Sequence, residues 1–524
     1  MSVKNRSFAL VLLLISLVLP AMSQTGPVFV NRAPEQSFTQ VYDGGWEHFV
    51  GGGVAVFDCN QDHFPDLYIA GGENPARLLL NRTGAVGAAL HFEPAATPGL
   101  QQVIGAYPLD VDSDGKLDLF VLRAGTNYIL RGLGDCHFES ANTAWHFDSA
   151  ERWSTAFAAT WEADQQWPTL VVGNYVDRAN PQGPFRACDS HAVYRPLGRR
   201  YTRPQTLTPG FCALSMLISD WGRTGIPDLR ISNDRHYYVR GGQEQLLRLD
   251  TPLRFYGPEE GWQPLSIWGM GISSRDISGD GIPEIVLTSM GDQKLLMLDS
   301  TAGQPRYREA PYQRGATAHR PYFGDEGRPS SGWHAEFGDV NNDGLDDLFI
   351  AKGNVDQMPD SAMHDPNNLL LQQADGRFIE VGDTAGIGSI ERSRGAGVVD
   401  LNLDGKLDIV VVNRRANFEL YENSSALSGH WLQLELRQPG VNRYAAGAWI
   451  EVSSGDKHWF REISIGGGHA SGRAGFEHFG LGAVPTVRYR ITWPDGVTSA
   501  WQDSPVNQHL IITRSGRELH QKRL

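Results

Sequence analysis

The sequence lacks the residue patterns that carry most enzymatic chemistry. It contains no Gly-x-Ser-x-Gly nucleophile motif, no phosphate-binding loop, no His-Glu-x-x-His zinc motif and no dinucleotide-binding fingerprint. The run Gly466-Gly467-Gly468 has no partner motif that would make it part of an oxyanion site, so we expect a tight β-turn there. Without these motifs, the sequence indicates no particular class of reaction.

Long apolar runs are also missing. The longest, residues 8–19, is shorter than the roughly 20 residues that a transmembrane helix needs. Lys4 and Arg6 precede this run and Ala21-Met22-Ser23 follows it, which is typical of a signal peptide. We expect residues 1–23 to direct export to the periplasm or the cell exterior, with no transmembrane segment. A buried N-terminal strand is the alternative.

Positive charge is under-represented. The chain has 46 Lys and Arg against 60 Asp and Glu, a formal net charge of −14 at pH 7. Such an acidic protein is a poor partner for nucleic acid or for an anionic membrane surface. We therefore expect no nucleic-acid partner, and we expect something cationic to compensate the charge.

Cysteine is scarce but even in number. The four cysteines allow three disulfide pairings in an exported chain, and no Cys-x₂-Cys pair suggests a zinc site. We favour a Cys188–Cys212 disulfide because both residues belong to one long irregular stretch, which we expect to decorate one face of the fold. For Cys59 and Cys136, a disulfide and a pair of free buried thiols are both open.

What the chain has in abundance is a repeated acidic loop. Five copies place oxygen-bearing side chains at positions 1, 3, 5 and 9 of a nine-residue loop, with a main-chain carbonyl expected to contribute at position 7. These residues are Asp58, Asn60, Asp62, Phe64 and Asp66; Asp110, Asp112, Asp114, Lys116 and Asp118; Asp276, Ser278, Asp280, Ile282 and Glu284; Asp339, Asn341, Asp343, Leu345 and Asp347; and Asp400, Asn402, Asp404, Lys406 and Asp408. Alternate residues of a tightly curled loop point inward, and Ca²⁺ binds six to eight oxygen ligands. We predict about five calcium sites, one per copy.

Position 6 of the loop supports this interpretation. It is glycine in four copies, as expected where the chain reverses with a positive φ. The first copy has His63 there instead. Histidine enters the left-handed region at some cost, so we expect weaker calcium binding by that loop.

The loops differ from EF-hands at position 12. An EF-hand has a bidentate Glu there, whereas all five copies have an apolar residue. Positions 10 to 12 are rich in β-branched and aromatic residues, which favour strands. We infer that the loops join strands to strands. A set of simple polar hairpin turns would not explain four ligand positions repeated five times.

Two further copies are degenerate. Residues 160–165 have lost the first acid and the glycine, whereas the other copy keeps Asp220 and Asp228 but has Gly222 and Thr224 at positions 3 and 5. We predict that neither binds Ca²⁺ well. The first positions of successive copies lie 50 to 63 residues apart, enough for one four-stranded sheet each. The pattern predicts an all-β fold, a seven-bladed β-propeller.

The residues around these loops resemble a known family. Segments such as 51–58 and 394–400 resemble FG-GAP or VCBS repeats, and segments 442–448, 466–468, 478–482 and 493–496 resemble the ASPIC/UnbV module. This combination is similar to the cartilage acidic protein family and its bacterial relatives. The resemblance implies a propeller over residues 27–424 and an ASPIC/UnbV-like domain over residues 425–524. Alternation of apolar and polar residues predicts that this second domain is a small antiparallel β-domain.

Together these features favour a calcium-binding, extracytoplasmic adhesion or interaction scaffold that recognises a protein or a glycan through one propeller face. The alternative is a carbohydrate-active enzyme of the lyase or dehydratase type with a site on a propeller face. Clustering of His48, His236, His319 and His334 would favour the enzyme, although ordinary loop and core histidines are the simpler reading.

Overall fold

The computed structural model describes residues 26–95, 99–183, 186–234, 239–300, 303–317, 327–426 and 429–524, so the predicted signal peptide lies outside the described residues. Within these ranges the chain is all-β, and its only helical segments are short. They are η1 (Ala33–Glu35), η2 (Trp46–His48), η3 (Pro258–Glu260), η4 (Tyr312–Arg314) and α1 (Gly382–Ala385). No helix among the described residues is long and apolar enough to cross a membrane.

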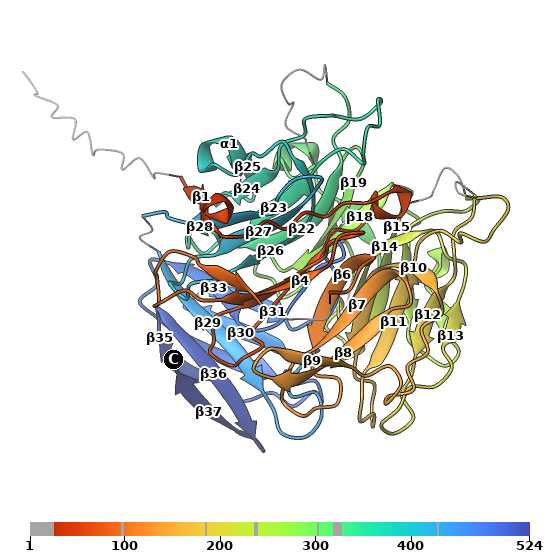
Figure 1. Cartoon of the computed structure of the whole chain (residues 1–524). Helices are drawn as coiled ribbons and strands as arrows, with labels where there is room; N and C mark the ends of the chain where they lie inside the picture. Colours follow the sequence, from red (N-terminus) through yellow and green to blue (C-terminus); the bar gives the residue numbers. More distant parts are fainter. Residues whose placement is uncertain are drawn as a thin grey trace, which may run out of the picture.

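Antiparallel sheets of consecutive strands repeat along residues 54–423 (Figure 1). In chain order their strands are β2 (Val54–Phe57), β3 (Asp66–Ile69), β4 (Arg77–Asn81) and β5 (Phe92–Pro94); β6 (Val103–Leu109), β7 (Asp118–Gly125), β8 (Tyr128–Gly134) and β9 (His137–Ser140); β10 (Arg152–Thr160), β11 (Thr169–Asn174), β12 (His191–Tyr194) and β13 (Gln205–Leu207); and β14 (Ala213–Ser219), β15 (Asp228–Asn233), β16 (Gln245–Arg248) and β17 (Arg254–Phe255). They continue with β18 (Gly269–Arg275), β19 (Glu284–Ser289), β20 (Lys294–Leu298) and β21 (Tyr307–Glu309); β22 (Gly332–Gly338), β23 (Asp347–Lys352), β24 (Asn368–Gln372) and β25 (Phe378–Glu380); and β26 (Arg392–Val399), β27 (Asp408–Arg414) and β28 (Glu419–Asn423).

The sheets close into a ring. The first strands of successive sheets contact one another in chain order from β2 to β26, and β26 in turn contacts β2. These strands are buried along most of their length because neighbouring sheets cover both of their faces, and every residue of β6 and β14 is buried. The N-terminal strand β1 (Phe29–Asn31) completes the last sheet by pairing with β28, with Phe29 opposite Asn423. The two ends of the ring are therefore joined by backbone hydrogen bonds.

The C-terminal residues form two further sheets, drawn in blue to one side of the ring in Figure 1. One contains β29 (His430–Arg437), β33 (Glu477–Gly482), β36 (Gln508–Ser515) and β37 (Glu518–Arg523). The other contains β30 (Trp449–Ser454), β31 (Lys457–Glu462), β34 (Thr486–Thr492) and β35 (Gln502–Pro505). The prediction of an antiparallel domain needs one correction, because β29 and β36 pair in parallel. The chain between them builds the second sheet and is long enough for the crossover that parallel pairing requires.

Both disulfides join neighbouring sheets. Cys188 pairs with Cys212, which confirms the favoured pairing, and Cys59 pairs with Cys136, which settles the open alternative. We predicted that the stretch around Cys188 decorates one face of the fold, and this prediction is wrong. The stretch supplies β12 and β13 of its own sheet. Prolines and polar residues around these short strands interrupt the run of apolar and β-branched residues that predicts a strand.

A segment of the C-terminal part lies inside the ring. Gly467 N–H donates to the Met216 carbonyl at 2.6 Å, and Gly468 N–H donates to the Ile272 carbonyl at 2.7 Å. A few residues on, β32 (Gly472–Arg473) pairs in parallel with β2. The tight β-turn predicted at Gly466–Gly468 was therefore wrong. These glycines have positive φ, and their amides bond to strands of separate sheets.

Candidate metal centres

The five acidic loops occupy one place in the fold. Each joins the first and second strands of its sheet, with position 1 directly after the first strand and position 9 at the start of the second. In the second copy, Asp110 follows β6 and Asp118 begins β7. Because the innermost strand of each sheet runs in the same direction, the loops gather at one end of the ring. The loops join strands, as predicted.

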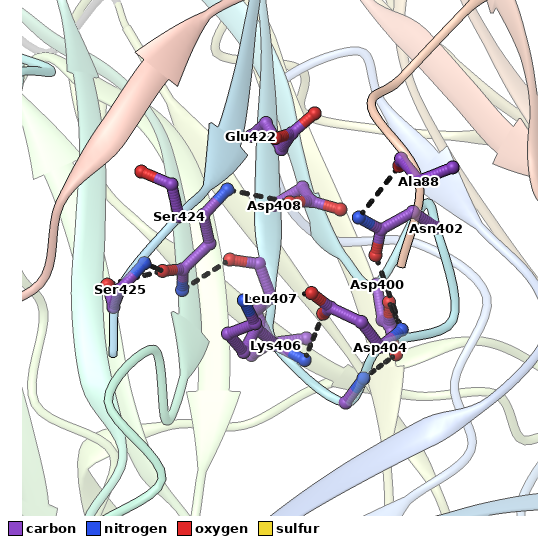
Figure 2. Close-up of polar contacts among 12 residues, drawn as sticks. Ala88, Asp400, Asn402, Asp404, Lys406, Leu407, Asp408, Glu422, Ser424 and Ser425 are labelled. Carbon is purple, nitrogen blue, oxygen red and sulfur yellow. Dashed lines mark hydrogen bonds and ion pairs between the residues drawn. The ribbon is translucent and has the colours of Figure 1, made fainter. Parts of the chain in front are cut away.

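Hydrogen bonds within a loop turn its carboxylates inward. Asp110 accepts from the N–H groups of Asp114 (3.1 Å) and Gly115 (2.9 Å), and Asp118 accepts from Val111 N–H (2.8 Å). Oxygens of Asp110, Asp112 and Asp118 lie within 4.8 Å of one another. Figure 2 shows the same arrangement in the last copy, with Asp400, Asn402 and Asp404 on one turn and Asp408 at the start of β27.

The backbone at position 6 of the acidic loops has the positive φ that the sequence predicts. The φ angles of Gly115, Gly281, Gly344 and Gly405 lie between 82° and 93°. His63 takes the same region with φ 78°, and its N–H donates to Asp58 at 2.8 Å like the glycine amides. The first loop therefore keeps the shape of the others, at the cost of a left-handed histidine.

Burial raises the pKa of several loop carboxyls. The pKa of Asp110 and of Asp66 rises to about 7, and that of Glu284 also to about 7, mainly because burial disfavours their charged forms. Neighbouring carboxylates add to the rise, whereas backbone N–H groups oppose it. For Asp118 and Asp408 burial raises the pKa well above its usual value. Ionising these groups together requires a compensating cation.

The donor set fits calcium. Carboxylate and amide oxygens suit a hard cation, and no zinc-like set competes within the described residues, because Cys59 and Cys136, which lie beside Asp66, form a disulfide. Side-chain cations already contact two loops. Arg131 Nε lies 2.8 Å from Asp112, and Lys406 Nζ lies 2.9 Å from Asp404. These contacts leave the position-1 and position-9 carboxylates untouched.

The degenerate copies have exchanged metal ligands for other partners. In the third sheet, Glu162 accepts from the Thr169 hydroxyl at 2.6 Å and from Arg195 Nε at 2.8 Å. In the fourth, Asp228 accepts from Trp221 Nε1 and from the Tyr256 hydroxyl, each at 2.8 Å. Side-chain donors thus fill the space that the five intact loops leave between carboxylates.

Hydrogen bonds and ion pairs join the C-terminal part to three of the acidic loops. Asp400 Oδ2 accepts from Gln433 Nε2 at 2.7 Å and lies 3.2 Å from His509 Nε2. In the sixth sheet, Trp459 Nε1 donates to the Gly344 carbonyl at 2.9 Å, and Arg461 pairs with Asp346 at 2.9 Å. The sequence did not predict these contacts. Alternation of apolar and polar residues placed Gln433 in a strand, but no pattern showed what its sheet would cover.

The second copy makes the third contact. Asn442 N–H donates to the Ser113 hydroxyl at 3.1 Å, and the Tyr444 hydroxyl donates to the Gly115 carbonyl at 3.3 Å. Both C-terminal residues belong to the connection between β29 and β30. The loops predicted as metal sites are therefore also the docking surface for the C-terminal sheets.

Between the ring and the C-terminal sheets lies a cavity of about 150 Å³ in which one arginine lies between two carboxylates. Arg473 contacts Glu336 at 3.0 Å and Glu477 at 2.8 Å. Of the four histidines whose clustering would favour an enzyme, two belong to the described residues. His334 lines the cavity and accepts from His469 N–H at 3.1 Å, whereas His48 lies elsewhere. His236 and His319 lie outside the described residues.

Comparison with known proteins supports the predicted organisation. Residues 339–411 match the FG-GAP-like repeat, and residues 438–519 match the model described as ASPIC and UnbV. No curated protein matches the chain.

Among solved structures, BBS1N from a complex with ARL6DN is 10% identical with a TM-score of 0.43, covering 75% of this chain and 97% of that one. An Agrocybe aegerita lectin that recognises non-reducing terminal N-acetylglucosamine is 15% identical with a TM-score of 0.38, covering 69% and 88%. A Trypanosoma rangeli sialidase is 11% identical with a TM-score of 0.33, covering 76% and 59%. Likenesses this distant carry no argument about function. The family matches do identify two parts of the chain: it contains an FG-GAP-like repeat and a C-terminal ASPIC/UnbV domain.

Proposed function

We propose that this protein is an exported, calcium-binding, seven-bladed β-propeller that acts as an extracytoplasmic interaction scaffold for a protein or a glycan. Its ASPIC/UnbV domain covers one end of the propeller, and calcium in the blade loops stabilises that attachment. The observation that carries the proposal is the contact between the acidic loops and the C-terminal sheets, above all Asp400 with Gln433 and His509.

The sheet arrangement supports the blade count. The ring holds sheets that begin with β2, β6, β10, β14, β18, β22 and β26, and the last takes its fourth strand from the N-terminus. Radial repetition of such sheets leaves only short edges. The disulfides between neighbouring sheets also suit an oxidising compartment outside the cytoplasm.

Charge supports calcium as the resident ion. Buried carboxyls with raised pKa values face one another in each loop, and a divalent cation would hold them ionised. Extracellular calcium modules bind with Kd of about 10⁻⁴ to 10⁻³ M, so about 1 mM calcium would stabilise the folded protein by about 0.4–1.4 kcal/mol per site. Five such sites together would matter for a fold of marginal stability.

The end of the propeller away from the ASPIC/UnbV domain is the surface we assign to partner binding. Its rim carries charged side chains in a network, in which Arg415 contacts Asp43 at 3.2 Å and Asp356 at 2.7 Å. The opposite end is occupied by the C-terminal sheets, and the channel by residues around Gly467. A partner therefore has one open end to recognise.

Chelation tests the proposal. Calorimetric melting of the secreted protein with calcium and with EDTA should show a clear fall in the unfolding temperature on chelation. Limited proteolysis should at the same time cut the junction around residues 425–430 faster. An unchanged melting curve in EDTA would refute the calcium role. Affinity capture on glycan arrays and from extracellular fractions, in calcium and in EDTA, then tests the scaffold role separately.

A further inference from the structure

A second cavity, of about 310 Å³, lies between the sheet of β14–β17 and the sheet of β18–β21, and none of the acidic-loop ligand positions lines it. Arg230 of β15 enters it from one side, and Tyr307 of β21 from the other. Glu244 and Trp262, from the connections that flank β16 and β18, complete its inner wall. We call this the Arg230 cavity.

The guanidinium of Arg230 is buried without a counter-charge in hydrogen-bond contact. The residue is only 4% exposed, and neither Nη1 nor Nη2 has a hydrogen-bond partner. Two aromatic rings lie against the group, with the guanidinium carbon 5.1 Å from the Trp262 ring centre and 4.7 Å from that of Tyr307. Ring contacts use the face of a guanidinium. Its in-plane donors are left for another partner.

The acids that line the cavity do not pair with Arg230, because Asp299 lies 3.8 Å from Arg308 and Glu309 lies 2.9 Å from Lys294. Glu244 is fully buried, and its Oε1 accepts from Asn233 N–H at 2.8 Å while Oε2 has no partner. Burial raises the pKa of Glu244 to about 8, so this carboxyl holds its proton at neutral pH. The Tyr307 hydroxyl lies beside the Arg230 guanidinium, and its own proton has no acceptor. The cavity therefore offers buried donors on three side chains.

Water alone does not account for these groups. A cavity of this volume holds several water molecules, which can bond to the hydroxyl and the carboxyl. Water carries no negative charge, however, and a buried cation is stabilised chiefly by an ionic partner. The volume also falls within the range of small-molecule sites. A small anion satisfies both the volume and the charge.

We propose that the Arg230 cavity binds a small molecule through a carboxylate or phosphate group, which the in-plane Nη donors of Arg230 grip. Guanidinium recognises either group through two parallel hydrogen bonds, and Tyr307 and Glu244 supply further donors. The site is independent of the calcium loops and of the partner surface, because its lining contains no loop acid and no residue of the C-terminal domain.

Thermal-shift titration and ligand-observed NMR with the calcium-saturated, full-length protein test this site. Acetate and lactate represent carboxylates, methyl phosphate represents phosphates, and uncharged acetamide serves as the negative probe. The anionic probe that saturates the protein at the lowest concentration is the preferred ligand. We expect saturable binding of at least one anionic probe and none of acetamide.

Arg230→Gln should raise the Kd of the bound probe at least about tenfold, because it removes a charge-assisted hydrogen bond. Arg377→Gln is the matched control, since Arg377 pairs with Asp375 on the protein surface and loses the same charge. If Arg230→Gln fails to fold, Tyr307→Phe removes one buried donor with little change in shape and should weaken binding severalfold. Absence of saturation with all anionic probes, or equal Kd values in wild type and both cavity variants, would overturn the proposal.

Discussion

Gly480 in β33 offers a sharp test of the coupling between a proposed calcium loop and the ASPIC/UnbV domain. A Cβ atom at this position would lie 1.8 Å from Asp339 Oδ2 and 2.3 Å from its Cγ. Asp339 is 1% exposed and accepts from Gly344 N–H at 2.7 Å, so its carboxylate cannot move without losing that bond. Gly480→Ala therefore forces either the loop or β33 to shift.

The cost follows from these two terms. Overpacking a buried site costs about 1–3 kcal/mol, and losing a hydrogen bond to a charged group costs about 1.5–3 kcal/mol. We expect Gly480→Ala to destabilise the protein by about 2.5–6 kcal/mol in total and to weaken calcium binding by the loop of Asp339.

Melting curves at several calcium concentrations, with calcium counted by equilibrium dialysis, measure both effects. Gly84→Ala is the control, because nothing lies within 4 Å of a Cβ at Gly84. A Gly480→Ala protein with wild-type melting and wild-type calcium content would show that the loop and β33 are not in the contact described.

Three further predictions rest on other parts of the structure. Asp112→Ala should remove about one equivalent of bound calcium and leave the other sites filled; loss of all calcium at once would contradict independent sites. In EGTA, the free energy of unfolding should fall as pH rises from about 4 to about 7, because the folded protein binds more protons than the unfolded chain while Asp66, Asp110 and Glu284 keep their raised pKa of about 7. Denaturant titrations at pH 5 and pH 7.5 measure this change in the free energy of unfolding, and added calcium should reverse its sign. Equal stability at the two pH values in EGTA would count against buried, protonated loop carboxyls. Replacing Cys188 and Cys212 with Ser opens a loop between residues 24 apart and should cost about 3 kcal/mol, measured by denaturation with and without reductant. A wild-type protein that loses no stability on reduction would contradict the predicted contribution of this disulfide.

The repeated loops show why part of this architecture could be predicted. The oxygen-bearing side chains at positions 1, 3, 5 and 9 are local in sequence, and the strands on either side follow from β-branched and aromatic residues next to the loop. Even the left-handed His63 could be expected, because the shape of the loop depends on consecutive residues. The spacing of the copies then indicated one sheet each.

Long-range contacts could not be predicted in the same way. Gly466–Gly468 have the composition of a turn, and only the ring of strands around them turns their amides into partners for Met216 and Ile272. Arg230 is equally ordinary in sequence, one polar residue in a strand. Its lack of a counter-charge depends on β21 and on the connection to β18, which lie dozens of residues away.

The sequence by itself determined the repeating sheets, the acidic loops and the presence of a distinct C-terminal domain, because each depends on neighbours a few residues apart. Only the tertiary structure decided where the loops face and what covers them. Closure of the ring brings them to one end, and the C-terminal sheets pack on that end through Gln433, Trp459 and His509. These contacts join residues up to 115 positions apart, for which no local pattern carries a signal.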